Sequence, residues 1–129
     1  MKQVQPDGWE RARGYSHGII GEGPILAVAG QIGWNPRTHV FEAKDFVGQT
    51  RQALQNVATV LEAAGTGPHH VIRLTWYITD RDAYLRSVRE LGAAYREVFS
   101  DRYPAMSVVV VAGLLEAEAL VEIEATAVV

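Results

Sequence analysis

Three side chains in this sequence have the types and positions that acid–base chemistry requires. Glu122 interrupts the apolar C-terminal segment ALVEIEATAVV, residues 119–129. A carboxylate among apolar neighbours is a candidate for holding a water or moving a proton, and the alternative is a solvated or ion-paired glutamate. Tyr15 and His17 are two residues apart, so both point to the same side of an extended segment. His17 is then either a base or donor beside Tyr15, or a structural or surface histidine.

Covalent and metal chemistry have less support in the sequence. The chain contains no cysteine, which excludes disulfides, thiolate nucleophiles and cysteine-ligated metals. Ser107 lacks the G-x-S-x-G context of an activated serine. His69 and His70 are adjacent in a turn without a nearby Asp or Glu. We expect their rings to point apart into solvent, and we expect no metal site there.

Periodicity and turn signals predict the elements that position these residues. Two strands joined by the GEGP turn form an antiparallel hairpin, and Pro104 opens a further strand with four consecutive valines. One helix begins after Asp45 as cap and ends at the glycine of Ala64-Gly65, and a second runs from Asp80 or Asp82 to Phe99. The predicted strands are residues 15–21, 25–32, 71–79, 105–112 and 119–129.

This order predicts a single α+β domain, residues 1–129, with a mostly antiparallel sheet and both helices on one face. The other face is left uncovered, yet the last strand and the valines of 108–111 are apolar on both sides. Packing of this face against copies of the same chain explains the pattern and predicts a homo-oligomer. The alternative is that a loop or the N-terminal segment folds across it.

Composition excludes several classes of protein. The 129 residues are 48% hydrophobic and 21% charged, as in ordinary globular domains. Twelve Lys and Arg against fifteen Asp and Glu give a net charge of −3, with no basic stripe for nucleic acid. No apolar run approaches the roughly 18 residues that span a bilayer, and the first residues lack the apolar core of a signal peptide. We therefore expect a cytoplasmic protein with neither nucleic-acid nor membrane partners.

Four segments, in this order, resemble the RidA (YjgF) family: GYSHGI at 14–19, AGQIGWNPRT at 29–38, QTRQALQNVATVLEAAG at 49–65 and VEIEATAV at 121–128. The resemblance implies a chorismate-mutase-like α+β fold, assembled as a homotrimer around a central barrel of sheets. Small-molecule clefts are then expected between neighbouring subunits. Members of the best-known branch hydrolyse reactive imines and enamines to 2-oxo acids and ammonia, and they need no metal or cofactor.

The same resemblance assigns candidate roles residue by residue. Glu122 matches the glutamate that positions water, and Tyr15 matches a cleft tyrosine that contacts substrate, unless it packs at a subunit edge. Gly30 and the backbone of Ser107 match cleft positions. Trp34 follows the second strand and either lines the pocket or covers the core.

Departures from the family pattern concern the substrate anchor. The deaminase branch has an arginine after the Pro-Ala pair, where a guanidinium donates two parallel hydrogen bonds to the substrate carboxylate. Here that residue is Met106, which cannot donate. Ala29 replaces a common serine, and Gly92 stands where an asparagine is often found. Arg11 and Arg13, just before Tyr15, are the nearest cations in sequence that could restore an anion site.

Two function classes remain. The first is a divergent hydrolase of imines or enamines. Its substrate either carries its acid group at a different place from the usual 2-imino acids or lacks a carboxylate next to the imine. The second is a noncatalytic trimer that binds a small metabolite or has a regulatory role. Ribonuclease activity, a label also attached to the family, ranks last because the chain is acidic and lacks a basic stripe with interleaved aromatics.

Overall fold

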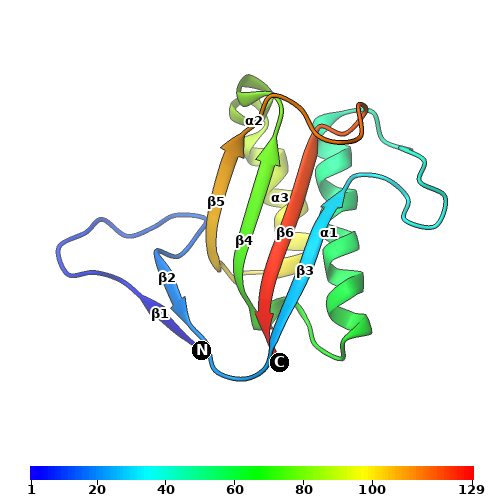
Figure 1. Ribbon diagram of the computed structural model, residues 1–129. Helices are drawn as coiled ribbons and strands as arrows, with labels where there is room; N and C mark the ends of the chain where they lie inside the picture. Colours follow the sequence, from blue (N-terminus) through cyan, green and yellow to red (C-terminus); the bar gives the residue numbers. More distant parts are fainter.

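A four-stranded sheet forms the centre of the computed structural model, which describes residues 1–129 (Figure 1). The strand order is β3-β6-β4-β5. β6 is antiparallel to both of its neighbours, whereas β4 and β5 run parallel. The bounds are Ile25–Ile32 for β3, Val71–Ile78 for β4, Ala105–Val110 for β5 and Val121–Val128 for β6. The predicted α+β fold with a mostly antiparallel sheet is thus confirmed.

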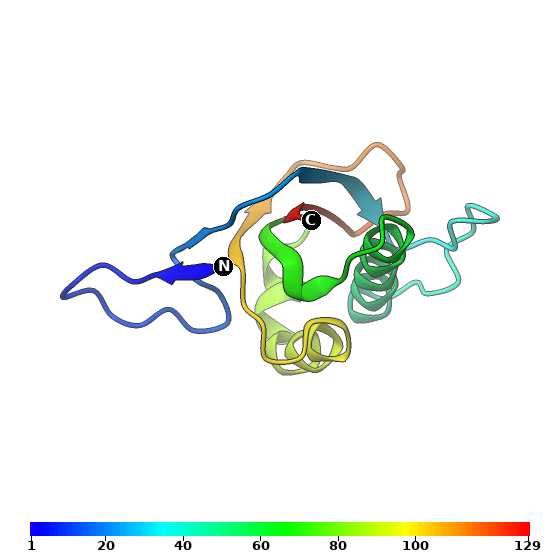
Figure 2. The same cartoon turned by 90° about the horizontal axis from the view of Figure 1, so that it is seen from below.

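The helices cover one face of this sheet, as Figure 2 shows from below. α1 spans Phe46–Ala63, α2 spans Arg81–Arg86, α3 spans Val88–Phe99, and a 3-10 turn, η1, spans Pro68–His70. Asp45 caps α1 as expected, accepting a hydrogen bond from the backbone N–H of Gly48 at 3.0 Å. Gly65 follows the helix with φ of 78°, which glycine adopts without strain. None of the helices combines the length and hydropathy needed to cross a bilayer.

The predicted single helix from Asp80 to Phe99 is wrong, because the helix breaks at Ser87. Asp80 caps only the short α2, by accepting hydrogen bonds from the N–H groups of Asp82 and Ala83. Ser87 leaves the helical conformation, with φ of −114° and ψ of 14°, and α3 starts again at the next residue. Residues 81–99 therefore form two helices and not one.

Alternation along β6 separates the core from the open face. Val121, Ile123, Ala125 and Ala127 are at most 4% exposed and belong to the main core beneath the helices. Glu122 and the other residues between them point to the uncovered face, because successive side chains of a strand alternate. The predicted two faces of the last strand are therefore confirmed.

The predicted hairpin of residues 15–21 with 25–32 is wrong. β2 (Gly18–Ile20) pairs instead with β1 (Lys2–Val4), and β3 pairs with β6. β1 and β2 form an arm that projects beyond the β5 edge and does not fold across the open face (Figure 1). The GEGP turn signal predicted pairing of β2 with β3, but β2 pairs with the N-terminal strand β1 instead.

The valine strand also differs from its prediction. β5 is an edge strand of the four-stranded sheet, and in one chain Val109 and Val110 are 41% and 51% exposed. It is therefore not buried on both faces by its own chain. The arm touches its start, where the N–H of Ser16 donates to the carbonyl of Pro104 at 3.0 Å. Burial of this strand in a homotrimer stays a prediction.

Candidate functional site

The predicted site residues fall into two separate regions of one chain. Glu122 pairs with Tyr77 of β4 on the open face of the sheet. Met106 pairs with the fully buried Leu74 and packs against the core on the helix-covered face. The Glu122 region and the Met106 cavity, as we call them below, therefore lie on opposite faces of the sheet.

Close approach of a glycine shapes the Glu122 region. A Cβ atom at Gly30 would lie 2.7 Å from Cδ of Glu122, so a side chain at this position would displace the carboxylate group from where it lies. The register of β3 shifts between Val28 and Gln31, and this bulge contains Gly30 and the exposed Ala29. The bulge brings the backbone of β3 against the Glu122 side chain.

The two glutamates on the open face of β6 differ in their partners. The Tyr77 hydroxyl donates to Oε1 of Glu124 at 2.8 Å, and this hydrogen bond raises the pKa of Tyr77. Glu122 makes no side-chain hydrogen bond and no ion pair. Glu122 is therefore the carboxylate that is free to hold a water or a substrate.

A hollow of about 340 Å³ opens beside Glu122 and Gly30, and Trp34 lines it. The Trp34 ring stacks on His39, with ring centroids 4.0 Å apart and planes 3° apart. His39 also lines the hollow and has φ of 60°, an uncommon conformation for a non-glycine residue. Trp34 lines this hollow and also packs against the small buried cluster of residues 32, 41 and 119, so both predicted alternatives have support and its part in a ligand site stays a prediction.

Two buried polar side chains of α1 hold this region in place. Asn56 donates to the carbonyls of Ile32 and Trp34 at 3.1 and 3.0 Å, which fixes the turn that carries the indole. Gln49, only 1% exposed, donates to the carbonyls of Ala43 and Glu118.

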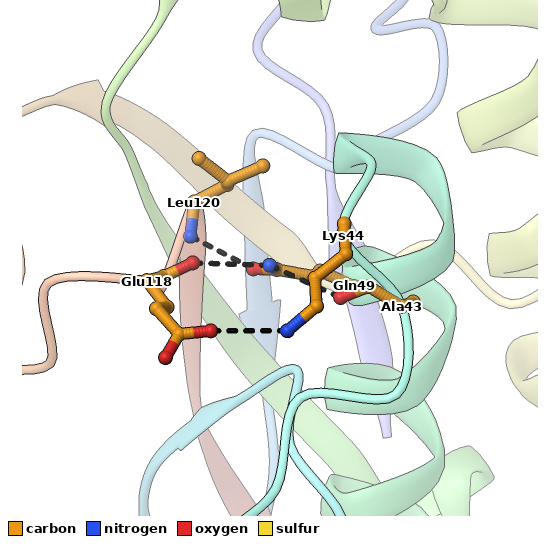
Figure 3. Close-up of polar contacts among 5 residues, drawn as sticks. All are labelled: Ala43, Lys44, Gln49, Glu118 and Leu120. Atoms are coloured by element: carbon orange, nitrogen blue, oxygen red, sulfur yellow. Dashed lines mark hydrogen bonds and ion pairs between the residues drawn. The ribbon is translucent and has the colours of Figure 1, made fainter.

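Figure 3 shows how Gln49 ties the approach to β6 onto α1. Its Oε1 accepts from the N–H of Leu120 at 2.8 Å, two residues before Glu122. Lys44 adds an exposed ion pair with Glu118 at 3.1 Å. The amide of Gln49 therefore sets where β6 begins and so where Glu122 lies.

The Met106 cavity has a volume of about 600 Å³ and is mostly apolar. Tyr15 and Met106 line it together with Trp76 and several residues of α3, including the buried Leu91 and Tyr95. Two cations, Arg13 and Arg96, line it as well. Arg11 does not; it lines a neighbouring hollow with His17. Of the two N-terminal arginines in the prediction, only Arg13 thus reaches the Met106 cavity.

Tyr15 and His17 lie together, as their spacing predicted, with ring centroids 5.5 Å apart in an edge-to-face arrangement. His17 is held from the other side by Trp9 at 5.1 Å and by its Nε2 contact with the carbonyl of Glu10 at 3.2 Å. His17 lines the neighbouring hollow and not the Met106 cavity. Ser107 faces the open side of the sheet and lines neither region.

The remaining histidine pair differs from its prediction. His69 and His70 do not point apart, because their ring centroids are 4.2 Å apart on the η1 turn. A hydrogen bond between the Thr66 hydroxyl and Nδ1 of His70 holds the second ring against the first. No group of three His, Asp or Glu side chains in the chain is close enough to hold a metal ion.

Comparison with known proteins supports the resemblance seen in the sequence. The family model described as Endoribonuclease L-PSP matches residues 8–129. The chain belongs to the RidA (YjgF) family. A RutC family protein of Pyrococcus horikoshii is 37% identical over 108 residues, covering 84% of this chain and 82% of the relative. The 2-iminobutanoate/2-iminopropanoate deaminase of Escherichia coli K12 is 35% identical over 109 residues, covering 82% and 80%.

A solved structure of the conserved Rid protein family, YyfB from Yersinia pestis, has a TM-score of 0.88 against this RidA-family chain. It is 30% identical, and the alignment covers 99% of this chain and 98% of that one. That structure is described as a protein of unknown function. The α+β fold of the chain is therefore shared along its whole length with a solved Rid protein.

Sequence reasoning missed three residues of this RidA-family chain. Arg96 is one helical turn after Gly92, a spacing that places both on one side of α3 and that signals a shared surface. His39 stacks on Trp34 only because of its left-handed backbone, for which the sequence has no signal. Gln49 lies within one of the family segments, but a buried glutamine with three partners cannot be recognised from its residue type.

Proposed function

We propose that this chain is a divergent imine or enamine hydrolase that adds water to a C=N bond and releases ammonia. One observation carries the proposal: Glu122 is an unpaired carboxylate above Gly30, whereas its neighbour Glu124 is engaged by Tyr77. Membership in a family that includes a 2-iminobutanoate/2-iminopropanoate deaminase supports this chemistry.

The reaction has two steps that balance without a further reagent. In the first step Glu122 takes a proton from water as the water oxygen bonds to the imine carbon, and it returns that proton to the imine nitrogen, which gives a neutral carbinolamine. In the second step Glu122 takes the carbinolamine O–H proton and gives it to the nitrogen as the C–N bond breaks, so that a carbonyl compound and ammonia leave. Glu122 thus acts as base and then as acid in each step, and the Tyr15 hydroxyl orients the substrate.

The site needs two chains in this proposal. Glu122 and Tyr15 belong to separate regions of one chain, on opposite faces of the sheet, so they cannot act together unless a neighbouring subunit supplies one of them. A homotrimer in which the Glu122 region of one subunit meets the Met106 cavity of the next completes the site. The exposed Val109 and Val110 on β5 support burial in such an assembly.

Met106 changes the expected substrate. A thioether donates no hydrogen bond and carries no charge, so a carboxylate next to the imine carbon finds no partner at this position. We therefore propose that 2-iminobutanoate and 2-iminopropanoate are poor substrates for this protein. The second candidate, a noncatalytic metabolite-binding trimer, draws support from the mostly apolar Met106 cavity, which can hold a ligand without any reaction. RNA cleavage ranks below both because the chain carries a net charge of −3.

The test uses imines that can be prepared without a partner enzyme. Benzaldimine and 4-carboxybenzaldimine are formed from the aldehydes in concentrated ammonia, diluted into buffer, and followed by stopped-flow absorbance. We expect the protein to accelerate loss of the C=N band, and we expect Glu122→Gln to reduce that acceleration by about 100-fold or more. Glu124→Gln is the matched control and should stay within about threefold of wild type. Equal rates for both variants would remove Glu122 from the mechanism.

A further inference from the structure

Two arginines from distant parts of the chain meet at the Met106 cavity. Arg13 comes from the loop that joins β1 to β2, and Arg96 comes from α3. Neither forms an ion pair, since the two salt bridges of the chain are Lys44–Glu118 and Arg51–Glu97. No Asp or Glu lines this cavity. The two guanidinium groups thus have no anionic partner within the chain.

Gly92 makes room for one of these cations. A Cβ atom at Gly92 would lie 3.1 Å from Nη1 of Arg96 and 3.8 Å from its Cζ, so the guanidinium lies over the bare backbone of α3. The Arg96 head therefore lies back along the helix toward Gly92, another residue of the cavity wall. Gly92, which departs from the family pattern, therefore provides the space that the Arg96 guanidinium occupies.

A buried donor in the same cavity also lacks a partner. Trp76 is 2% exposed and lines the Met106 cavity, and its Nε1 is the one buried side-chain nitrogen or oxygen without a hydrogen bond. An unsatisfied buried donor costs free energy, and an acceptor on a bound molecule would remove that cost. This unpaired donor lies in the wall of the cavity, and a small side-chain movement would be needed to bring it to a bound acceptor.

We infer that Arg13 and Arg96 bind the carboxylate of a substrate with an apolar body, replacing the anchor that Met106 cannot provide. The inference rests on the proposed function for its assumption that the Met106 cavity is the substrate cleft. The guanidinium groups belong to the arm and to α3, not to β5, so the bound acid group lies away from Met106 itself. The substrate class is then an imine or enamine whose carboxylate is separated from the C=N group by an apolar spacer.

The size and lining of the cavity agree with such a molecule. About 600 Å³ is within the range of small-molecule sites and exceeds what a four-carbon imino acid fills. Met106 and Val108 of β5 supply apolar contact to the spacer, together with Leu91 of α3. Arg13 and Arg96 are both exposed, so each alone would pair weakly with a carboxylate in water. Two guanidinium groups on one carboxylate add charge-assisted hydrogen bonds and so strengthen the pairing.

The test measures binding and needs no turnover. The probes are 4-methylbenzoate and its neutral counterpart 4-methylbenzyl alcohol, titrated by NMR into the full-length protein. We expect the benzoate to bind about tenfold more tightly than the alcohol, and Arg13→Ala or Arg96→Ala each to weaken the benzoate by about fivefold to tenfold without changing the alcohol. The matched controls are Arg11→Ala in the same loop and Arg89→Ala on the same helix, neither of which lines the cavity. Both should bind like wild type.

Equal affinity for the two probes, or equal losses in the variants and controls, would overturn the anion site. Loss of alcohol binding in the arginine variants would also count against it, because it would indicate a collapsed cavity. The binding test and the hydrolysis test can fail separately. If the protein hydrolyses benzaldimine but does not prefer benzoate, the proposed hydrolase function stands and the anion site is rejected. Selectivity for benzoate without any hydrolysis retains the anion site and favours the metabolite-binding alternative.

Discussion

Gly92 and Arg96 occupy one site on α3, because the guanidinium of Arg96 fills the space that a side chain at Gly92 would need, with 3.1 Å between Nη1 and the missing Cβ. A glycine within a helix costs stability relative to alanine. Gly92 therefore lowers the stability of α3 but leaves room for the Arg96 guanidinium at the cavity. The next prediction separates these two effects.

Gly92→Ala should have opposite effects on stability and on binding. It should raise the free energy of unfolding by about 0.5–1 kcal/mol, because alanine favours the helix and the flexible Arg96 head can swing away. The same displacement should weaken binding of 4-methylbenzoate by about threefold to fivefold. Urea unfolding and NMR titration measure the two effects. Ala93, exposed on the same helix, offers Ala93→Gly as a control that should lower stability and leave binding unchanged. Unchanged affinity in Gly92→Ala would mean that the position of Arg96 does not matter.

Gln49 should be among the most costly polar residues to replace. Gln49→Ala removes hydrogen bonds to Ala43, Glu118 and Leu120 at a site that is 1% exposed (Figure 3). We expect a loss of about 2–4 kcal/mol in the free energy of unfolding, since buried groups are left without partners. Gln55→Ala, on the exposed side of α1, should change stability by less than about 0.5 kcal/mol. Similar losses at both positions would show that the amide network is not what fixes the start of β6.

Tyr95 should make the fold sensitive to alkali. Burial raises the pKa of Tyr95, and its ring stacks between Phe99 and Tyr103. Because the folded pKa lies above the unfolded value of about 10, the stabilisation is complete below about pH 10 and falls as pH rises above it. The expected slope is about 1.4 kcal/mol per pH unit from this group. Urea midpoints between pH 9 and 11 should fall less steeply in Tyr95→Phe than in wild type. A wild-type slope in Tyr95→Phe would reject this assignment.

Mixing two inactive variants tests whether a site is shared between subunits. Glu122→Gln and Tyr15→Phe should each be impaired in imine hydrolysis. If each site takes Glu122 from one chain and Tyr15 from the next, random mixed trimers made by refolding equal amounts should regain about a quarter of the wild-type sites. Activity no greater than the mean of the two separate variants would contradict a site that joins Glu122 of one chain to Tyr15 of the next. Sedimentation that shows a monomer would exclude the shared site directly.

Much of the fold follows from local sequence signals, and the failures have physical reasons. Asp45, Gly65 and the alternation along β6 act through short-range capping, backbone freedom and side-chain direction, so the sequence predicts them well. The pairing of β2 with β1 and not with β3 depends on contacts between segments that the turn signal at GEGP does not encode. The break at Ser87 is similar, because a serine in a helical pattern gives only a weak signal.

The candidate site, like the fold, could be predicted from the sequence only in part. The resemblance to the RidA family singled out Glu122, Gly30 and Met106 as site candidates, and the structure puts each on the strand predicted for it. The sequence could not place Arg96 at the Met106 cavity, because that position depends on how α3 packs beside β5 and on the space left by Gly92. Tertiary packing, which residue type alone does not reveal, decides which arginine is available to a ligand.

A gain-of-function change tests the role of Met106. Met106→Arg puts a guanidinium at the position that holds the substrate carboxylate in the deaminase branch. We expect hydrolysis of 2-iminobutanoate, followed by semicarbazide trapping, to increase by about tenfold or more. Met106→Leu is the volume-matched control and should not increase it. No gain in Met106→Arg would show that other features, such as Ala29, also bar this substrate.

The most direct measurement is the ratio of two hydrolysis rates in the wild-type protein, each expressed as kcat/KM over the uncatalysed reaction. One substrate is 2-iminobutanoate, with its carboxylate next to the C=N carbon, and the other is 4-carboxybenzaldimine, with its carboxylate across an apolar ring. We predict that 4-carboxybenzaldimine is favoured by about tenfold or more, corresponding to about 1.4 kcal/mol in the transition state. A rate for 2-iminobutanoate equal to or above that for 4-carboxybenzaldimine would contradict the proposal that Met106 shifts the substrate preference of this protein away from 2-imino acids.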